Sequence, residues 1–408
     1  MYRFTTSNSK EMHIDDLRLA LFSFICAKQS NNMFIVRIEE ENKKNIEAKD
    51  KELVDILAIF GITYDNLYYQ SENFKYHLQF ASSLMDKKKA FACFCKEDEL
   101  KDTKYNGKCL HISEDELLNN NLPFTIRIKK PQNNIKLNDT LKGSLSFSPD
   151  EIDSFIIMKQ DKYPTHNFAC AIDDMIQGVK YIINSEEHIS NTAKQEFIRD
   201  SIGYKDEIKY AHIPTILNTS SVKWLLDQGY MPEAIINYLL LLGNETPTQI
   251  FTLEEAIKWF ELTKISKTTT TFDINKLSFI NREHIKLVED IELSKRLGYS
   301  CSSIGKLAKL YTQECSTTYE IKEKIDTIFA PKKSDEYKES LDKLKKIVKE
   351  APYFEEFEKF KKYMEEKSEL KSKDFFNTFR ILLTGEKSGP DLTEVYPLIK
   401  NYLQEIAK

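Results

Sequence analysis

The 408-residue chain has few glycines and no long apolar run. It contains 11 glycines, well under the usual ~7%, and the first of them is Gly61. No apolar run reaches the ~18 residues of a transmembrane helix. Asp15, Asp16 and Arg18 interrupt the N-terminal region before a signal peptide could form. These absences predict a cytoplasmic protein that is rich in helices and has few tight turns.

Disulfide bonds are also not expected. The seven cysteines are an odd number spread over a long chain, unlike the disulfide frameworks of small secreted domains. Apolar residues make up 41% and charged residues 30% of the chain, which is typical of a globular protein. The net charge of -5 excludes a uniformly basic coat for nucleic acid but leaves room for a local basic groove.

The first ninety residues alternate between strand and helix patterns. Strands are expected near Arg3 and over Met33–Glu39, and helices over 13–28, 46–60 and 74–89. This order predicts a parallel sheet covered by helices. The lack of a G-x-G-x-x-G motif argues against a dinucleotide-binding fold of the dehydrogenase type.

Beyond residue 90 the pattern changes twice. Residues 91–154 bring a cysteine cluster, loops and a short strand over 124–129, and they are interpreted as an insertion. Further strands are then expected over 155–159, 167–172 and 180–184, followed by a helix over 191–202. After residue 212 the chain is expected to be almost entirely helical. Lys and Glu at helical spacing over 333–373 are typical of a solvated helix face.

Seven groups of short motifs follow one another along nearly the whole chain. They are Arg3-Phe4-x-x-Ser7 with His13-Ile14, Arg37-Ile38-Glu39-Glu40, Tyr163-Pro164-Thr165 with Ala169–Asp174, Glu186-Glu187-His188 with Ser190-Asn191-Thr192, Gly229–Ala234 with Asn237-Tyr238-Leu239, Phe272-Asp273 with Leu277 and Ile280-Asn281, and Arg380–Gly385 with Gly389-Pro390. In order and spacing these motifs resemble those of the glutamyl-tRNA synthetases, which are class I aminoacyl-tRNA synthetases.

The resemblance implies an architecture and a partner. The fold would be an α/β Rossmann-like catalytic core with an inserted α+β domain, followed by an all-α C-terminal half. The implied domains are the first half of the core (1–90), an acceptor-stem-binding insertion (91–154), the second half of the core (155–211), a helical stem-contact region (212–298) and a helical anticodon-binding domain (299–408). The partner would be a tRNA of the glutamate or glutamine type, without DNA or membrane, bound by a monomer. Basic residues on the expected insertion are Lys104, Lys108, Arg127, Lys129 and Lys130.

The resemblance also assigns candidate residues for binding glutamate and ATP. They are Arg3, Ser7, His13, Glu39, His166, Cys170 and Asn184. His166 stands where the family has a tyrosine, and Asn184 stands where it has an arginine. Asparagine cannot replace the bidentate, charge-assisted pair that arginine makes with a carboxylate.

Two nucleotide-binding signatures depart from the family pattern. His13 and Ile14 match the start of H-I-G-H, but Asp15 holds the glycine position and places a negative charge where a triphosphate would lie. The alternative interpretation is that Asp15 and Asp16 simply cap the helix that follows. The K-M-S-K-R loop, expected after Asn218, is missing, and losing such cations typically costs ~10²–10³ in rate per group.

These departures predict a tRNA-binding protein, descended from a glutamate–tRNA ligase, that is impaired or inactive in adenylation. His13 would then be the remnant of a catalytic signature. The alternatives are an active glutamate–tRNA ligase with atypical motifs, or a ligase adapted to another substrate. ATP and Mg²⁺ are expected as cofactors only if the chain is active.

A cysteine cluster suggests a metal. Cys93-x-Cys95, Tyr105 and Cys109 resemble the zinc pattern of the inserted domain in some glutamyl-tRNA synthetases. Thiolates suit Zn²⁺, and a closed set of four ligands would be structural. His111 is the alternative to Tyr105 as the fourth ligand, and three idle thiols are the alternative to zinc.

Overall fold

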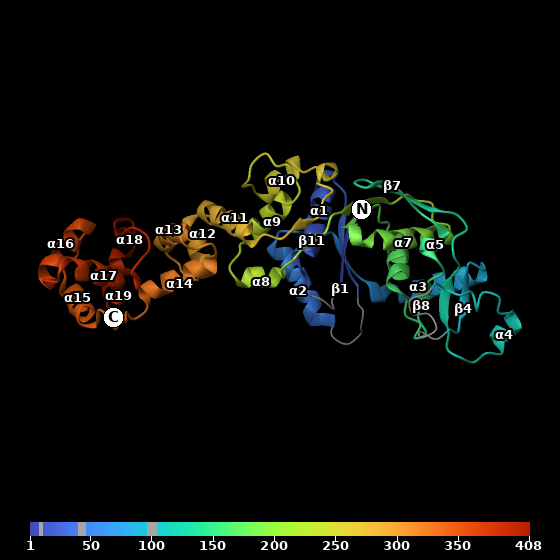
Figure 1. The fold of residues 1–408 in the computed structure, drawn as a ribbon, viewed down its shortest axis with the longest axis horizontal. Coiled ribbons are helices and arrows are strands. Elements are labelled where there is room, and N and C mark those ends of the chain that lie inside the picture. Colours follow the sequence, from blue (N-terminus) through green and yellow to red (C-terminus); the bar gives the residue numbers. More distant parts are fainter. Residues whose placement is uncertain (8–10, 40–45, 96–103) are drawn as a thin grey trace. The chain divides into compact units, whose positions relative to one another are not determined.

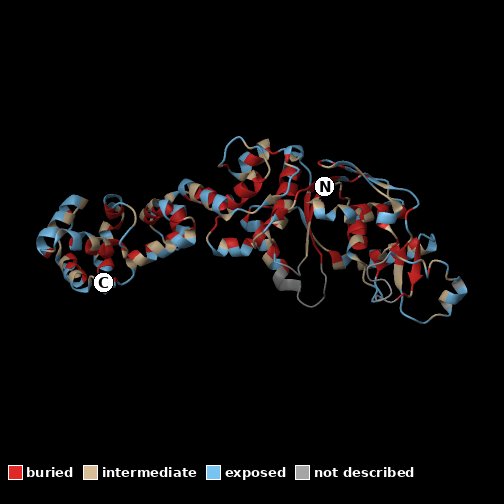
Figure 2. Ribbon diagram, viewed as in Figure 1, coloured by how far each residue is buried: buried red, intermediate tan, exposed pale blue. Residues whose placement is uncertain are grey.

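The computed structural model describes residues 1–7, 11–39, 46–95 and 104–408, and it divides into two compact units (Figure 1). Unit 1 comprises Met1–Val222 and Leu239–Phe272, and unit 2 comprises Lys223–Tyr238 and Asp273–Lys408. Each unit encloses buried residues of its own (Figure 2). Among the described residues, no helix is long and apolar enough to cross a membrane.

Unit 1 is built on a seven-stranded sheet with the strand order β3-β2-β1-β9-β10-β6-β7. Its strands are β1 (Tyr2–Ser7), β2 (Phe34–Glu39), β3 (Asn66–Tyr69), β6 (Ile135–Asp139), β7 (Gly143–Phe147), β9 (Tyr181–Ser185) and β10 (Lys209–Ile213). All neighbours pair in parallel except β6 and β7, which form an antiparallel hairpin. The register sets Ser7 opposite Glu39, so these two candidate residues end their strands at the same edge of the sheet.

Five longer helices surround this sheet. They are α1 (Ile14–Gln29), α2 (Ile46–Ile59), α3 (Phe74–Asp86), α6 (His166–Ile176) and α7 (Ile189–Ile202). One core cluster joins α3, α6 and α7 to the sheet through side chains such as Leu84, Phe168, Ile198 and Ile35. α1 contacts both β1 and β9 as well as α10 (Leu253–Trp259). The Rossmann-like α/β core predicted from the sequence is therefore confirmed.

A second, three-stranded sheet has the order β4-β5-β8 and is antiparallel throughout. Its strands are β4 (Ala90–Cys93), β5 (Thr125–Ile128) and β8 (Ile156–Met158). The remaining short elements of unit 1 are η1 (Gln70–Asn73), α4 (Glu114–Leu118), α5 (Pro149–Ile152), η3 (Glu186–His188), η4 (Leu262–Lys264), and the paired strands β11 (Ile216–Leu217) and β12 (Thr270–Thr271).

Two expectations about these strands differ from the structure. The strand expected over 167–172 is wrong, because this segment lies inside α6. The apolar run Phe168–Ile172 is equally suited to a buried helix, and only the residues on either side distinguish the two. The hairpin β6–β7, within the stretch interpreted as an insertion, extends the main sheet, because Tyr210 of β10 pairs with Asp139.

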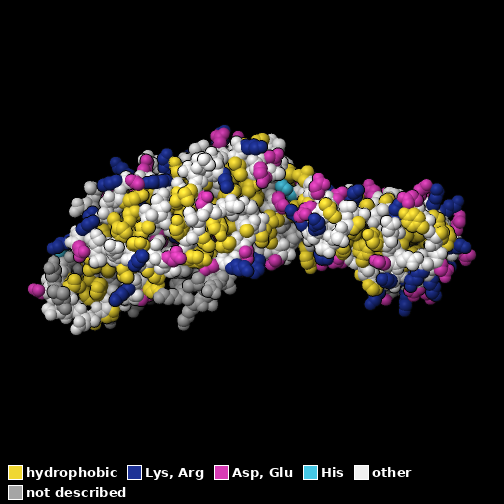
Figure 3. Space-filling model, turned by 180° about the vertical axis from the view of Figure 1, so that it is seen from behind, with side chains coloured by type: hydrophobic (Ala, Val, Ile, Leu, Met, Phe, Trp, Pro, Cys, Tyr) yellow, Lys and Arg dark blue, Asp and Glu magenta, His cyan; other side chains and the backbone are white. Residues whose placement is uncertain are grey.

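The C-terminal part of the chain is helical, as expected. Its helices are α8 (Val222–Asp227), α9 (Pro232–Leu241), α11 (Ile274–Leu287), α12 (Asp290–Arg296), α13 (Ser302–Leu310), η5 (Tyr311–Gln313), α14 (Thr318–Phe329), α15 (Lys338–Glu350), α16 (Phe357–Ser368), α17 (Ser372–Thr384), α18 (Leu392–Ile399), η6 (Lys400–Tyr402) and α19 (Leu403–Ile406). Packed rings of Phe357, Phe360, Phe375, Phe379 and Tyr396 fill part of the core of unit 2. On the face shown in Figure 3, side chains of both charge signs cover these helices.

The few glycines of the chain lie where the backbone has a positive φ or where two helices pack closely. All 11 lie in the described ranges, and ten of them have a positive φ, which other residues rarely adopt. The eleventh is Gly305 of α13, where an added Cβ would lie 1.8 Å from the carbonyl oxygen of Asp290. None of them lies at the N-terminus of α1.

Candidate functional site

The N-terminus of α1 is covered by the short connection that follows β11. Ile14 N donates to the Ser220 carbonyl at 3.1 Å, and Val222 N donates to the Met12 carbonyl at 3.0 Å. The His13 ring nitrogen Nδ1 lies 3.1 Å from Thr219 Oγ1. Asn218, where the lysine loop was expected, has a φ of 55° and turns the chain directly onto this helix end. The connection thus occupies the N–H of Ile14, one of the donors that a helix N-terminus offers to phosphates.

Acidic side chains stand at the same helix end. Asp16 Oδ2 accepts a hydrogen bond from His13 N at 3.3 Å, which supports the interpretation that this carboxylate caps the helix. Asp15 differs, because its buried Oδ1 has no hydrogen-bond partner among the described residues. A buried polar atom without a partner costs free energy, so Asp15 does not act as a complete cap.

A small cleft lies beside these carboxylates. It encloses roughly 60 Å³ and is lined in part by Asp15, Asp16, Glu187 and His188. The guanidinium of Arg18 also lines it, but this group is committed to the carbonyls of Pro214 and Leu242 at 3.1 and 3.0 Å. Ligand pockets are usually about 300–1,000 Å³, so this cleft is smaller than a usual ligand pocket.

Arg3 takes part in a buried ion-pair network. Its Nε and Nη2 donate to the two oxygens of Asp174 at 3.1 and 3.2 Å. Arg37 Nη1 donates to the same Asp174 at 2.7 Å. Burial opposes the charge of Asp174, but the two guanidinium groups hold its pKa below the usual range. Because Arg3 is only 4% exposed and already paired, it offers little to a substrate carboxylate in this arrangement.

The neighbouring Asp173 is held by polar side chains that no sequence motif indicated. It accepts hydrogen bonds from Gln70 Nε2 and Asn73 Nδ2, both at 3.0 Å, and lies 2.8 Å from His77 Nε2. The adjacent aspartates of the Ala169–Asp174 motif were the available signal, since a buried carboxylate requires partners.

Glu39, His166 and Cys170 come together at the end of β2. Cys170 Sγ donates to Glu39 Oε1 at 3.1 Å, and His166 Nδ1 lies 3.2 Å from Glu39 Oε2. Burial opposes the charge of Glu39, yet the hydrogen bond from His166 lowers its pKa. Burial and the Glu39 carboxylate raise the pKa of the Cys170 thiol, while Cys170 and Glu39 raise the pKa of His166 to about 11.

Three further sequence-predicted residues are Ser7, Asn184 and His13. Ser7 pairs with Glu39 in the strand register. Asn184 Oδ1 accepts a hydrogen bond from Ser185 N at 2.9 Å. His13 contacts Thr219 instead. Glu40 of the quoted motif lies outside the described residues.

A buried line of Asp139, His212 and Thr192 has the outline of a catalytic triad. His212 Nδ1 lies 2.7 Å from Asp139 Oδ2, and its Nε2 lies 2.9 Å from Thr192 Oγ1. All three residues are at most 5% exposed, so no substrate reaches the hydroxyl. The line joins β6, β10 and α7 and is structural.

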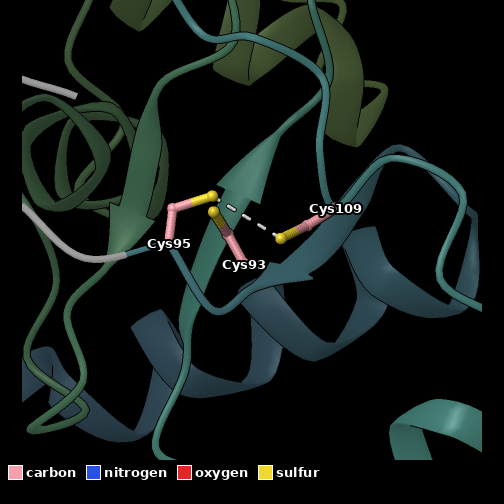
Figure 4. Close-up of side chains that lie close together, drawn as sticks. All are labelled: Cys93, Cys95 and Cys109. Carbon is pink, nitrogen blue, oxygen red and sulfur yellow. Dashed lines mark hydrogen bonds between the residues drawn. The ribbon is translucent and has the colours of Figure 1, made fainter. Parts of the chain in front are cut away.

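The cysteine cluster forms where β4 ends (Figure 4). The three sulfurs of Cys93, Cys95 and Cys109 lie within 4.8 Å of one another, and all three residues are buried. Cys95 Sγ and Cys109 Sγ are 3.7 Å apart. Tyr105 Oη lies 4.0 Å from Cys93 Sγ and accepts a hydrogen bond from Cys109 N. These donors suit a tetrahedral Zn²⁺, whose sulfur ligands are separated by about 3.8 Å.

His111 is not part of the metal-binding group that the described residues form. Arg127, one of the basic residues of the expected insertion, is 7% exposed. Its guanidinium lies 4.5 Å from the centre of the Tyr105 ring and donates to the Ser154 carbonyl at 2.7 Å. Arg127 therefore packs inside the inserted region, next to a residue of the cysteine cluster.

Comparisons with known proteins identify the class of protein to which this chain belongs. The family model described as "tRNA synthetases class I (E and Q), catalytic domain" matches residues 1–279, and the model "Anticodon binding domain" matches residues 283–401. Together with the parallel sheet, these matches define a class I aminoacyl-tRNA synthetase. A relative named Glutamate–tRNA ligase 1 from Campylobacter jejuni (strain 81-176) is 49% identical over 431 residues, covering 100% of both chains. The chain belongs to the glutamyl-tRNA synthetase family.

Other relatives agree with this placement. Glutamate–tRNA ligase 2 of Sulfurimonas denitrificans is 48% identical, again over 100% of both chains. A crystal structure of a glutamate tRNA ligase from Elizabethkingia meningosepticum, in complex with its amino acid, matches the fold with a TM-score of 0.81 and 21% identity, covering 99% of this chain and 97% of that one.

The length of the Campylobacter match is informative. It spans 431 residues, whereas this chain has 408. At least 23 matched positions therefore have no residue in this chain.

Proposed function

We propose that this chain is a tRNA-binding member of the glutamyl-tRNA synthetase family that does not form glutamyl adenylate at the rate of an active ligase. The observation that carries the proposal is the closed N-terminus of α1. There, the backbone of 218–222 and the carboxylates of Asp15 and Asp16 stand where the family binds ATP.

Adenylation is a displacement at the α-phosphate, so it depends on placed cations and free N–H donors. Ile14 N is already bonded to Ser220, and Arg18 is bonded to two backbone carbonyls. The cleft of roughly 60 Å³ beside this helix end is smaller than a usual ligand pocket, which supports a site that does not hold ATP. The sequence that follows Asn218 runs directly into Thr219-Ser220-Ser221 and contains no K-M-S-K-R loop, which supports the loss of these cations.

The proposed partner is a tRNA of the glutamate or glutamine type. The match to an anticodon-binding domain over residues 283–401 and the names of the relatives support this partner. Helices α12 to α18 in this stretch are complete and enclose a buried core. The part of the chain that would meet the anticodon is thus complete, which supports tRNA binding without adenylation.

The proposal is tested by glutamate- and tRNA-dependent ATP–pyrophosphate exchange, with the Campylobacter ligase as the active reference. Exchange is expected to stay at background with every tRNA of a panel, and exchange within about tenfold of the reference would overturn the proposal. A gain-of-function variant sharpens the test. Asp15→Gly combined with a K-M-S-K-R loop inserted after Asn218 is expected to raise exchange, and Asp15→Gly alone serves as its matched control.

The tRNA-binding part is tested separately by filter retention. Retention is expected at low salt and should fall steeply as salt rises, because phosphate contacts release counterions. No retention at low salt would overturn tRNA binding without bearing on the exchange result.

We also propose a structural zinc ion held by Cys93, Cys95, Cys109 and Tyr105. The buried thiols and the 3.7 Å sulfur separation support this ligand set. Metal analysis of purified protein is expected to find zinc that is lost from Cys109→Ser. Zinc content that is equal in the two proteins would overturn this assignment.

A further inference from the structure

We propose that Glu39, His166 and Cys170 form a second metal site, which binds a divalent cation such as Zn²⁺ through three protein ligands and leaves a fourth position open. This site is separate from the cysteine cluster and does not depend on tRNA binding. Its three ligand atoms lie within 4.8 Å of one another.

The distances between the ligand groups are close to those of a tetrahedral site. Cys170 Sγ lies 3.1 Å from Glu39 Oε1 and 3.7 Å from His166 Nδ1, and the other carboxylate oxygen, Glu39 Oε2, lies 3.2 Å from His166 Nδ1. A Zn²⁺ ion with bonds of about 2.3 Å to sulfur and about 2.0 Å to nitrogen and oxygen keeps its ligand atoms roughly 3.3–3.6 Å apart. The three side chains therefore need only small shifts to coordinate an ion.

The fold holds these ligands in place. His166 and Cys170 are four residues apart at the start of α6, so they lie on one face of the helix, one turn apart. Glu39 is the last residue of β2, and Arg37 Nη2 lies 3.5 Å from its Oε1. Asp174 of α6 accepts a hydrogen bond from Arg37 Nη1 of β2 at 2.7 Å. The approach of the helix to the strand end is thus fixed by hydrogen bonds.

A divalent cation leaves the charge of this network balanced. The network contains two guanidinium groups, from Arg3 and Arg37. Three carboxylates face them, from Asp173, Asp174 and Glu39. This leaves an excess of one negative charge, which a protonated His166 beside Glu39 balances when no ion is bound. An ion of charge +2 that takes the place of the His166 proton and the Cys170 thiol proton, both released to solvent, keeps the total charge unchanged.

The site is open on one side. Cys170 is 2% and Glu39 is 8% exposed, whereas the side chain of His166 is 58% exposed. A metal held by three protein ligands with a solvent-facing fourth position is the arrangement that binds water or a small anion. The expected exchangeable ligand is the carboxylate of a small acid. The metal ion would bind this carboxylate itself, so that no unpaired arginine side chain is required.

The experiment is a titration of metal-free, full-length protein with Co²⁺, whose visible absorption reports bound thiolate. The wild type is expected to bind two equivalents per chain, and Cys170→Ser and His166→Gln are each expected to lose one. Cys26→Ser is the matched control, because Cys26 is buried in α1 and belongs to no metal-binding group of the described residues. It should keep both equivalents.

Two results would overturn the proposal. One is a wild-type protein that binds a single equivalent of Co²⁺, when this equivalent is lost in Cys109→Ser but in neither Cys170→Ser nor His166→Gln. The other is unchanged binding in both Cys170→Ser and His166→Gln. Because His166 is exposed, His166→Gln tests the site even if Cys170→Ser fails to fold. Adding glutamate should shift the part of the spectrum that depends on Cys170, and an unshifted spectrum would overturn the open fourth position.

Discussion

The backbone N–H of Ile14 donates to the carbonyl of Ser220 at 3.1 Å. This bond joins the first turn of α1 to the connection between β11 and α8, although the two segments lie far apart in the sequence. In the family that connection carries the lysines that hold the triphosphate. Here it is a short link that satisfies the helix end with its own backbone, and a nucleotide would have to displace it.

The two aspartates of this helix end are expected to differ in their effect on stability. Asp16→Ala removes the acceptor of His13 N and should lower the free energy of unfolding by about 1 kcal/mol. Asp15→Ala removes a carboxylate with an unpartnered buried oxygen and should change it by less than about 0.5 kcal/mol. Urea denaturation of both variants checks this, and a larger loss for Asp15→Ala would contradict the assignment of Asp16 as the cap.

Asp174 is expected to be essential to the core of unit 1. Asp174→Asn removes the charge that pairs with both Arg3 and Arg37 and should cost about 3–5 kcal/mol, because two buried guanidinium groups lose their counterion. Asp206→Asn is the matched control. Asp206 pairs with Lys180 at the surface, where such pairs contribute at most about 1 kcal/mol. Equal urea midpoints for the two variants would contradict the importance of the buried network.

Much of the fold was predictable from local patterns. β1, β2, α1, α3 and α7 lie close to where apolar periodicity placed them. The failures have physical causes. The run from Phe168 to Ile172 is buried on all sides, so it carries no period to distinguish helix from strand. The hairpin β6–β7 was missed although its residues alternate around Gly143, since short alternating runs are weak signals on their own.

The residue types of the candidate site could be predicted from the sequence, but the contacts between those residues could not. The C-x-C spacing was sufficient to predict the cluster of Cys93 and Cys95 with Cys109, because few other structures need that pattern. Nothing in the sequence indicated that Asp174 would bind both arginines, or that Ser220 would reach Ile14. Such pairs join residues far apart in sequence, and only the three-dimensional packing determines them.

The cysteine cluster is expected to stabilise the inserted region through its metal. Cys95→Ser should lose one zinc per chain and lower the melting temperature, because metal-binding free energy contributes to folding. Cys301→Ser is the control, since Cys301 belongs to no metal-binding group of the described residues. Atomic absorption and thermal unfolding check the prediction, and a zinc content per chain equal to that of the wild type would contradict it.

The close packing of α12 and α13 depends on Gly305. Gly305→Ala would place a Cβ 1.8 Å from the Asp290 carbonyl oxygen and should cost about 3 kcal/mol, because backbone cannot move aside cheaply. At Gly298, φ is +87° and no atom lies within 4 Å of the place that a Cβ would take, so Ala should cost only about 1 kcal/mol. Urea unfolding compares the two, and a smaller loss at Gly305 would show that the helices separate easily.

Lys332 is expected to make the stability of unit 2 depend on pH. Burial, with a smaller effect of Lys345, lowers the pKa of Lys332 from 10.5 to about 8. Its Nζ donates to the carbonyls of Thr327 and Ala330 at 2.8 and 2.9 Å, around the end of α14. Lys332→Met leaves these carbonyls without their donor and should destabilise the protein at every pH.

The size of that loss should increase with pH. Between about pH 8 and pH 10 the folded Lys332 has released its proton while the unfolded lysine still holds one, so unfolding takes up a proton and a higher pH favours the folded wild type. Methionine does not titrate, so the difference between wild type and Lys332→Met should widen by up to about 1 kcal/mol per pH unit. Lys333→Met, at an exposed neighbouring position, is the control. Urea midpoints at about pH 8 and pH 10 test this, and a difference that stays constant or narrows would show that Lys332 keeps its proton in the folded chain.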